Sequence, residues 1–266
     1  MKLDYRSLPG TGGVLLWPAP EDVPEGFRVF FATRVFTGKQ GPRFVNYGFT
    51  GIPGAEESKS NFCRIAGLDF EKLTLCRQTH SADVVPVDGE NAGTGRGGPD
   101  SLSITADGLM TNIEGVPLGI TTADCVPIMI ADPVSRSIAA VHAGWRGTDG
   151  GIVGNAVAAL RREFGAEPAA MRAYMGPSIG PCCYEIGDEI AGRLSKKDEE
   201  FLTERDGGRY LDLRAWNASK LVSAGLSPMN IYAADACTKC NTGLFFSYRG
   251  DKECMGSNIT IIVKDK

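Results

Sequence analysis

The sequence predicts an α/β protein whose sheets are covered by helices. Three observations support this fold class. Short apolar runs of strand length recur along the chain, and several are apolar at consecutive positions, which indicates strands buried on both faces. Other segments carry an apolar residue every three or four positions, as amphipathic helices do. Strands that alternate with such helices are typical of sheets with helical layers on their faces.

The apolar runs place the expected strands at residues 27–36, 73–79, 116–121, 126–130, 138–141, 170–175 and 259–263. Helical periodicity is clearest at residues 151–164, 187–194 and 213–224. Residues 89–99 are rich in glycine and charge, which predicts a mobile loop. The chemically informative motifs lie on both sides of that loop and no internal repeat is found. Residues 1–266 are therefore expected to form a single domain.

The composition excludes several classes of function. The chain has 28 basic and 32 acidic residues with no long run of either sign, so neither nucleic acid nor an anionic membrane is an expected partner. The N-terminus lacks the apolar core of a signal peptide, and no stretch approaches the roughly 18 apolar residues of a membrane span. A cytoplasmic protein is expected. Its 8 cysteines should then remain thiols, with Cys63 and Cys76 as small core residues.

The chain contains only 2 histidines, and both lie in motifs with further polar groups. His80 ends Gln78-Thr79-His80, and His142 begins His142-Ala143-Gly144-Trp145-Arg146-Gly147. Between them lies Thr122-Ala123-Asp124-Cys125. Imidazole and thiolate are preferred ligands of zinc, so His80, Cys125 and His142 are expected to bind one zinc ion. Three protein ligands leave a fourth position open, as in catalytic zinc sites.

The proximity of Cys125 and His142 is predicted from a β-hairpin. Residues 126–130 and 138–141 flank a possible four-residue turn from Asp132 to Ser135. If Asp132 pairs with Ser135, the register places Cys125 opposite His142, with Cβ atoms about 4.5–5.5 Å apart. The same geometry allows a metal-free alternative, in which Cys125 is a nucleophile and His142 its base. That dyad leaves His80 without a role, which favours the metal.

The residues after His142 join a buried strand to a helix. Glycine allows close approach to a ligand, and helix N-termini attract anions, so this turn could hold a phosphate with Arg146 as a clamp. The alternative is a plain loop with Asp149 as the helix cap. Arg34 and Arg249 are further candidates for an anionic or polar substrate group, although most arginines only solvate a surface.

Two aspartates and four further cysteines complete the set of candidates. Asp107 and Asp124 each follow an alanine, and either could orient a ligating histidine or move a proton, with capping as the competing role. Cys237-Thr238-Lys239-Cys240 has a spacing found in zinc ribbons and redox sites, but no second pair with that spacing follows. Structural or incidental thiols are expected there. Cys182-Cys183 lies in a Gly/Pro-rich segment that could line a pocket, but the simpler expectation is a turn that leads into a helix.

These motifs together resemble the polyphenol-oxidase or laccase-domain (YfiH-like) family of purine nucleoside phosphorylases. The resemblance spans residues 27–263. It rests on Gln78-Thr79-His80, Ala106-Asp107-Gly108-Leu109, Thr122-Ala123-Asp124-Cys125, His142-Ala143-Gly144-Trp145-Arg146-Gly147, Gly176-Pro177-Ser178-Ile179-Gly180 and Phe245-Phe246-Ser247-Tyr248-Arg249.

The resemblance implies a four-layer α/β/β/α sandwich with mixed sheets and a zinc ion on His80, Cys125 and His142. It also implies phosphorolysis of adenosine, inosine and S-methyl-5'-thioadenosine, together with adenosine deamination. The chain departs from the family's pattern in two places. Val35-Phe36 replaces a pair of glycines, and Met255-Gly256-Ser257 replaces Thr-Gly-Arg.

In the mechanism hypothesised on the basis of this resemblance, zinc activates a water for deamination. Phosphate, held by Arg34 and Arg146, attacks the sugar in phosphorolysis. Nucleoside and phosphate are thus the expected small-molecule partners, and the sequence does not identify a partner protein. The His-x-Glu and Pro-Cys-x-x-Cys signature of zinc nucleobase deaminases is absent.

Three rivals remain at this point. A polyphenol oxidase with copper is disfavoured, because 2 histidines cannot supply several copper sites. An amidase that edits peptidoglycan precursors would use the same zinc or the Cys125 thiolate. The third rival is a metal-binding protein without catalytic activity.

Overall fold

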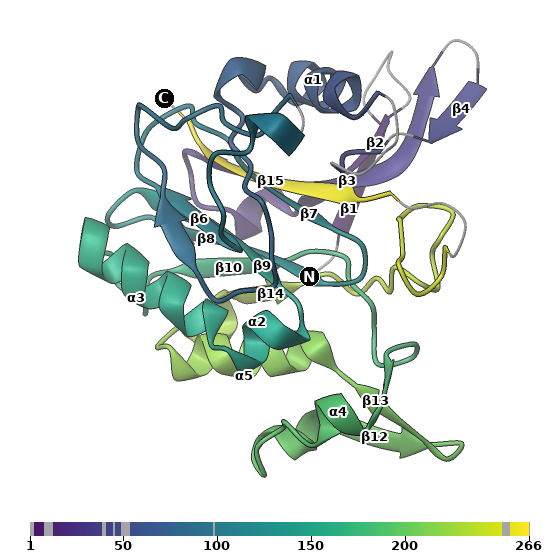
Figure 1. The fold of residues 1–266 in the computed structure, drawn as a ribbon. Helices are drawn as coiled ribbons and strands as arrows, with labels where there is room; N and C mark the ends of the chain where they lie inside the picture. Colours follow the sequence, from purple (N-terminus) through teal and green to yellow (C-terminus); the bar gives the residue numbers. More distant parts are fainter. Residues whose placement is uncertain are drawn as a thin grey trace.

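The computed structural model describes residues 3–7, 13–38, 41–44, 46–48, 54–97, 99–251 and 256–265. Two six-stranded sheets lie face to face, and helices cover both outer faces (Figure 1). The order of the layers is therefore α/β/β/α, which confirms the predicted fold class and the arrangement implied by the family resemblance. In the described part of the chain, no helix has the length and apolar character needed to cross a membrane.

The first sheet has the strand order β1-β2-β3-β15-β7, and β4 pairs with the far end of β3. All its described pairings are antiparallel. Side chains alternate across the sheet, so Phe30 and Ala32 of β3 pack toward α1 whereas Val29 and Phe31 pack toward the second sheet. Its strands are β1 (Leu3–Ser7), β2 (Gly13–Pro18), β3 (Phe27–Gly38), β4 (Gly41–Phe44), β7 (Leu118–Thr122) and β15 (Asn258–Lys264).

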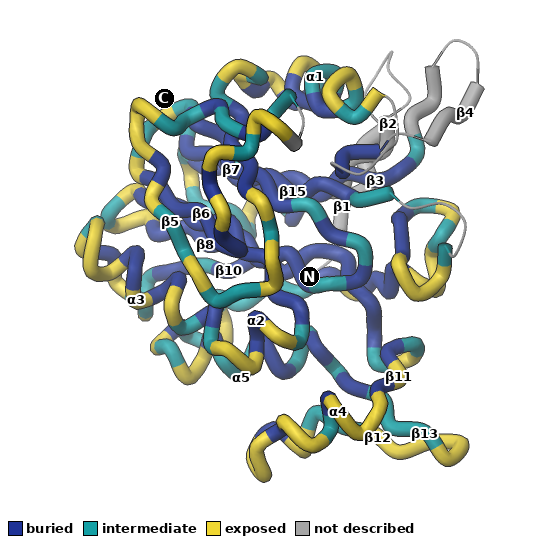
Figure 2. The backbone as a smooth tube through the Cα atoms, viewed as in Figure 1, coloured by how far each residue is buried: buried dark blue, intermediate teal, exposed yellow. Residues whose placement is uncertain are grey.

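The second sheet has the strand order β14-β10-β8-β9-β6-β5. It is mixed, because the two outermost pairs are parallel and the three inner pairs are antiparallel. Every residue of β8 and β9 is buried, as expected for strands covered on both faces (Figure 2). Its strands are β5 (Val84–Pro86), β6 (Gly108–Thr111), β8 (Val126–Asp132), β9 (Ser137–Ala143), β10 (Arg172–Met175) and β14 (Ile231–Ala233).

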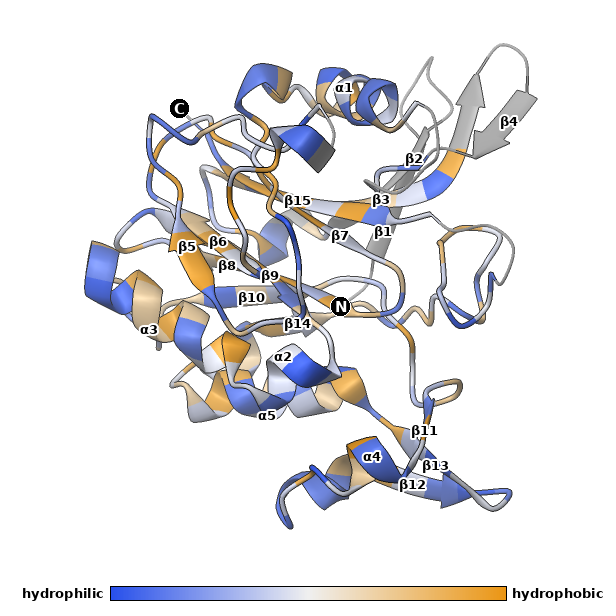
Figure 3. Ribbon diagram, in the orientation of Figure 1, coloured by the Kyte–Doolittle hydropathy of each residue, from blue (hydrophilic) through white to orange (hydrophobic). Residues whose placement is uncertain are grey.

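Helices pack on each outer face through their apolar sides. The helix α1 (Ala55–Ala66) covers the first sheet, and α3 (Ile152–Phe164) and α5 (Leu213–Ser223) cover the second. The hydropathy colours of Figure 3 show apolar positions concentrated on the strands between these layers. Two short helices, α2 (Trp145–Asp149) and α4 (Asp188–Ala191), lie at loops. One-turn 3-10 helices occur at Pro20–Asp22, Phe70–Lys72, Pro99–Ser101, Asp198–Phe201 and Pro228–Asn230.

A small third sheet and α4 extend away from the four layers (Figure 1). The strands of this third sheet are β11 (Glu185–Ile186), β12 (Leu202–Arg205) and β13 (Gly208–Leu211), in the order β11-β13-β12. β12 and β13 are largely polar and form a hairpin, whose turn contains Asp206 and Gly207 at positive φ. This extension follows directly on the loop that carries Cys182 and Cys183.

Most of the predicted elements are confirmed, with two exceptions. Residues 73–79 form no strand and make only isolated bridges, from Thr74 to Leu118 and from Arg77 to Thr105. The apolar run that suggested a strand there reflects the burial of Leu73 and Leu75 beside α1. The helix predicted at residues 187–194 is limited to Asp188–Ala191. The sequence analysis missed α1, whose buried face includes only a few apolar residues beside Lys59.

The glycine-rich loop predicted at residues 89–99 packs closely against the backbone of Leu75. The N–H of Leu75 donates to the carbonyl of Thr94 at 2.9 Å, and the N–H of Gly95 donates to Ser101 at 2.9 Å. Gly95 has a φ of +81°, and a Cβ there would lie 2.7 Å from the Leu75 carbonyl oxygen. Glycine is therefore needed at position 95, because any side chain would clash with the backbone of Leu75.

The β8–β9 hairpin forms, but its predicted register is wrong. Asp132 pairs with Ser137, and Pro127, not Cys125, lies opposite His142. The loop is two residues longer because the Asp132 carboxylate accepts the N–H groups of Val134 and Ser135, at 3.3 and 2.9 Å. A shift of two positions preserves which face each side chain occupies. Cys125 therefore still lies on the face of His142, as a diagonal neighbour just before β8.

Candidate metal centre

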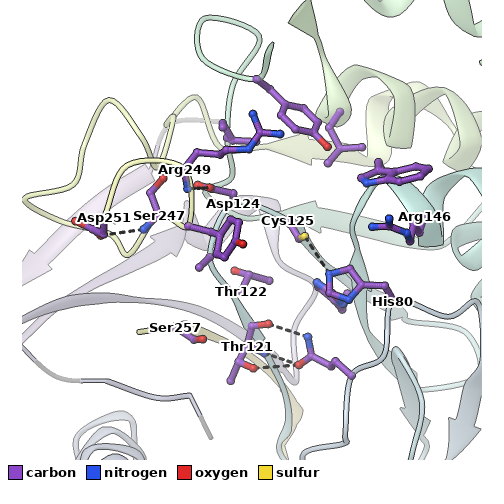
Figure 4. Close-up of a pocket in the computed structure, with 18 of the residues that line it drawn as sticks. His80, Thr121, Thr122, Asp124, Cys125, Arg146, Ser247, Arg249, Asp251 and Ser257 are labelled. Carbon is purple, nitrogen blue, oxygen red and sulfur yellow. Dashed lines mark hydrogen bonds between the residues drawn. The ribbon is translucent and has the colours of Figure 1, made fainter. Parts of the chain in front are cut away.

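Three potential ligands converge at one end of the second sheet. His80 lies in a loop before β5, Cys125 immediately precedes β8, and His142 lies near the end of β9. The Sγ of Cys125 lies 4.0 Å from Nε2 of His80, and the ligand atoms of all three residues lie within 4.8 Å of one another. Figure 4 shows the His80 ring and the Cys125 thiol directed at each other.

The donor set fits a zinc-like ion. Zn–N and Zn–S bonds of about 2.0–2.3 Å in a tetrahedron imply ligand atoms about 3.3–3.8 Å apart, so a small inward movement of the side chains is sufficient. The two imidazole rings meet edge to face, with centroids 4.8 Å apart and planes at 76°. With three protein ligands, a fourth position remains for a reactant.

Asp107, directly before β6, holds the two histidines in place. Its carboxylate is fully buried. Oδ1 lies 2.7 Å from Nδ1 of His142, which donates its proton there and leaves Nε2 as the metal-binding atom. The same carboxylate accepts the N–H groups of Thr79, His80 and Ser81, at 3.0, 3.0 and 2.7 Å. One side chain therefore orients His142 and fixes the loop that carries His80.

The charge of Asp107 is maintained by these donors. Burial alone raises the pKa of the Asp107 carboxyl. The hydrogen bonds from His142, Ser81 and Thr79 outweigh burial and hold this pKa below its ordinary value. The carboxylate is thus anionic across the physiological range.

Cys125 and His142 form a thiolate–imidazolium pair in the absence of metal. Burial raises the pKa of the Cys125 thiol, but the neighbouring His142 and hydrogen bonds from both histidines lower it to about 6. Burial lowers the pKa of His142, but the Cys125 thiolate and Asp107 raise it to about 9. At neutral pH the sulfur is therefore already in the form that binds metals.

This pairing predicts how metal binding depends on pH. Between about pH 6 and 9 the metal-free pair carries one proton, on His142, and binding must release it. Metal affinity should rise about tenfold per pH unit in this window, and more steeply below about pH 6, where the thiol is also protonated. Calorimetry in buffers of different ionisation enthalpy measures the release, and subtraction of the Cys125→Ser signal isolates this site. Binding without proton release at pH 7.5 would contradict the assignment.

The backbone around two of the ligands adopts an uncommon conformation. His80 has a φ of +61°, and Asp124, which precedes Cys125, has a φ of +92°. Non-glycine residues occupy this region only where surrounding contacts compensate the strain. Asp107 provides such contacts for the His80 loop. Asp124 accepts the Thr238 hydroxyl at 2.6 Å and the Arg249 N–H at 2.8 Å.

Gly144 leaves space for the ligands. A Cβ at this position would lie 2.9 Å from Sγ of Cys125 and 3.1 Å from Cδ2 of His80. Gly144→Ala is therefore expected to displace the thiol and lower metal affinity by about tenfold or more, as misoriented ligands do. A competition titration with a metal indicator checks this.

The matched control for this change is Gly154→Ala. Gly154 lies within α3, and nothing lies within 4 Å of a Cβ built there. We expect unchanged metal affinity and a gain in stability of about 0.5–1 kcal/mol, because alanine favours the helix. Equal metal affinity in Gly144→Ala and Gly154→Ala would show that space at Gly144 is irrelevant to the centre.

The three ligands open onto a cavity of about 820 Å³. The Gln78 side chain fixes one wall, because its amide donates to the Thr121 carbonyl at 2.8 Å and accepts the Thr121 N–H at 3.0 Å. Trp145 and Tyr184 contribute aromatic surface. Besides these residues, the walls include Thr122, Ala123, Asp124, Arg146, Ile179, Leu213, Ser247, Tyr248, Arg249, Asp251, Gly256 and Ser257.

The predicted arginines divide into two groups. Arg146 and Arg249 line the cavity, and Figure 4 shows both around the metal ligands. The Arg146 guanidinium stacks over Trp145 at 4.2 Å, and a side-chain N–H of Arg249 donates to the Glu185 carbonyl at 2.9 Å. Both retain donors for an anion.

Arg34 has a different role from the one expected. Its side chain is buried and is not among the residues that line the cavity. It donates to Asp251 at 2.7 Å and to the carbonyl of Thr242 at 2.9 Å. Its guanidinium also packs over the Phe246 ring at 4.4 Å. This placement argues against the expected contact between Arg34 and the anion, because a carboxylate and a carbonyl already engage the guanidinium behind the cavity wall.

The two aspartates also differ. Asp107 contacts His142, which is consistent with the expected role of orienting a ligating histidine. Asp124 lines the cavity, but its carboxylate joins Thr238 and Arg249 and makes no described hydrogen bond to a histidine. Asp149, expected as a helix cap, pairs with Arg193 at 3.3 Å, and Gly151 occupies the N-cap of α3.

Several wall residues were missed by sequence reasoning. Tyr184 reaches the cavity from the turn before β11, whereas Ser247 and Asp251 come from a single turn more than 60 residues later, in which the N–H of Ser247 donates to Asp251 at 3.1 Å. Of the family departures, Ser257 lines the cavity and its N–H donates to Asn46 at 2.8 Å. Val35 pairs with Phe44 in the first sheet. Met255 and the side chain of Phe36 lie outside the described residues.

Residues 51–265 match the model of a family described as multi-copper polyphenol oxidoreductase laccase. The chain is 36% identical over 198 residues to purine nucleoside phosphorylase YlmD of Geobacillus stearothermophilus, covering 73% of this chain and 72% of that protein. It is 36% identical over 188 residues to adenosine deaminase RL5 of an unknown prokaryotic organism, covering 69% and 71%. The crystal structure of YlmD from G. stearothermophilus superposes with a TM-score of 0.88 at 29% identity, covering 98% and 99%.

Proposed function

Because this chain belongs to the family of the multi-copper polyphenol oxidoreductase laccase, we propose that it is a metal-dependent purine nucleoside phosphorylase that also deaminates adenosine. In this proposal, residues 1–266 act as one catalytic domain, and the substrates are adenosine, inosine and S-methyl-5'-thioadenosine with phosphate. The observation that carries the proposal is the centre of His80, Cys125 and His142, which opens onto a cavity.

The cavity has the size and lining that a nucleoside needs. Its volume of about 820 Å³ lies within the range of small-molecule sites. Trp145 and Tyr184 offer aromatic faces against which a purine can stack. Arg146 and Arg249 provide charged donors for phosphate. Gln78 and Thr121 are locked together, which keeps that wall rigid.

We propose zinc as the ion at this centre. When bound, zinc supplies Lewis acidity toward the group that reacts. Asp107 orients His142 and keeps Nε2 free for the ion, and Gly144 gives Cys125 the space to approach. Several copper sites do not fit, because the chain has 2 histidines and both belong to this one centre.

Product analysis tests the proposal. The purified protein is incubated with adenosine, with and without phosphate, and adenine, ribose 1-phosphate and inosine are separated. Phosphorylase activity releases adenine and ribose 1-phosphate only with phosphate, whereas deaminase activity forms inosine without it. Inosine and S-methyl-5'-thioadenosine are tested in parallel. If all three nucleosides remain intact in zinc-loaded protein, the proposal is wrong.

One observation favours a second candidate function. Cys125 has its pKa lowered to about 6 beside a protonated His142, as in cysteine hydrolases. An amidase that uses this thiolate would be blocked by iodoacetamide and would resist chelators. The metal-dependent enzyme would instead lose activity to chelators and regain it with zinc.

A further inference from the structure

Four cysteines from two distant segments form a second sulfur cluster. Cys182 and Cys183 lie in the turn before β11, and Cys237 and Cys240 lie in the turn after β14. Their Sγ atoms all lie within 4.8 Å of one another. Sγ of Cys240 is 3.6 Å from that of Cys182 and 3.4 Å from that of Cys183. The partner that the Cys-x-x-Cys motif lacked in the sequence is therefore the adjacent pair Cys182-Cys183.

The spacing of the sulfurs suits a tetrathiolate metal site. A Zn–S bond of about 2.3 Å in a tetrahedron places sulfurs about 3.8 Å apart, close to the two distances found. A disulfide requires about 2.05 Å, and all seven described cysteines are free thiols. The described sulfurs are thus arranged around a point and are not joined in pairs.

The backbone holds the two segments together at the cluster. Ser178 and Cys237 form a parallel bridge, and the N–H of Thr238 donates to the Ser178 carbonyl at 3.0 Å. The N–H of Gly180 donates to Sγ of Cys237 at 3.2 Å, an interaction that favours a thiolate. The N–H of Asn241 closes the turn by donating to the Cys237 carbonyl at 3.1 Å.

Two arginines lie on the Cys182 side of the cluster. Four thiolates with a divalent ion carry a net charge of −2, which needs neighbouring cations or N–H donors. A side-chain N–H of Arg205 donates to the Cys182 carbonyl at 2.6 Å. A Cβ on Gly180 would lie 3.2 Å from Sγ of Cys182 and 3.3 Å from a guanidinium nitrogen of Arg214. Both arginines therefore lie beside the segment that carries Cys182.

We infer that Cys182, Cys183, Cys237 and Cys240 bind one zinc ion in a structural site, separate from the centre of His80, Cys125 and His142. Four sulfurs complete the tetrahedral coordination of the ion and leave no position for a substrate, as is typical of structural zinc sites. On binding, the thiols release their protons to solvent and the sulfurs ligate as thiolates.

The position of this site gives it a consequence for the cavity. Thr238, inside the Cys-x-x-Cys turn, donates its hydroxyl to Asp124 at 2.6 Å, and Asp124 precedes Cys125. Tyr184, which follows Cys183, lines the cavity. An ion that joins the two segments would therefore hold one cavity wall in place.

The test is the zinc content per chain of four purified proteins, measured by elemental mass spectrometry. We expect two equivalents in the wild type, one in Cys240→Ser and one in Cys125→Ser. Cys63→Ser is the matched control, because Cys63 lies on the buried face of α1, and this variant should retain two equivalents. The readout is metal content, so it does not depend on whether nucleosides are substrates.

Cobalt provides a second measurement if Cys240→Ser does not fold. Cys125→Ser protein, loaded with cobalt(II), should show the intense thiolate-to-cobalt charge-transfer bands of four sulfur ligands. The inference is overturned if Cys240→Ser retains as much zinc as the wild type. It is also overturned if cobalt-loaded Cys125→Ser lacks those bands, or if peptide mapping of the protein as purified finds disulfides among these four residues.

Discussion

Cys125→Ser protein should lose one equivalent of bound metal and at least about 10³-fold of its nucleoside turnover. The lost thiolate is the one anionic ligand of the centre, and a serine hydroxyl stays protonated near neutral pH. A metal Lewis acid contributes several kcal/mol to transition-state stabilisation, which corresponds to about three powers of ten in rate. Elemental analysis and a product assay with adenosine measure the two effects.

Cys63→Ser separates this effect from general damage to the core. Cys63 is fully buried on the inner face of α1 and belongs neither to the cavity lining nor to either group of potential metal ligands. Its replacement should lower stability by about 1–3 kcal/mol through a buried hydroxyl, with metal content and turnover retained in the folded protein. If Cys125→Ser retained wild-type metal and turnover, the three-ligand centre would have to be abandoned.

Asp107→Asn is expected to weaken the centre and the fold together. The amide keeps the shape of the carboxylate but loses its charge, and its NH₂ group must face donors that now contact oxygen, among them Nδ1 of His142 and the N–H of Ser81. Loss of such an orienting partner lowers metal affinity about 10–100-fold. Unpaired buried donors should also reduce the free energy of unfolding by about 2–4 kcal/mol.

Asp132→Asn is the matched control for this change. Asp132 is equally buried, lies at the far end of β8, and accepts the N–H groups of Val134 and Ser135. Its replacement should lower stability by a similar amount and leave metal affinity unchanged. Denaturant unfolding and a metal competition titration measure both quantities in each variant. Equal metal affinities in the two variants would show that Asp107 has no orienting role.

The ligands of the centre could be proposed before the structure because their chemistry is rare in this chain. His80 and His142 are the only 2 histidines, so any zinc or proton-transfer site had few alternatives. Cys125 followed from the hairpin, although the register was wrong by two positions. The error did not change the proposed ligands, because side chains two positions apart share a face of the sheet.

Residues whose chemistry is common could not be assigned in this way. Arg34 and Arg249 were equivalent candidates in the sequence, yet one is buried against Asp251 and the other lines the cavity. Four cysteines in two motifs showed no shared spacing, because the strands that bring Cys182 close to Cys240 are separated by more than 50 residues of chain. The helix α1 was missed because its buried face is short of apolar residues.

The sequence by itself determined the α/β class, the buried strands β3, β7, β8, β9, β10 and β15, the helices α3 and α5, and the three side chains able to bind a metal. These depend on hydrophobic periodicity and residue chemistry, which are local properties. Only the tertiary structure decided that Asp107 joins His142 to the His80 loop, that Arg34 lies behind the cavity wall and that four thiols meet. Such contacts depend on loop conformation and on the packing of distant segments, which local periodicity does not encode.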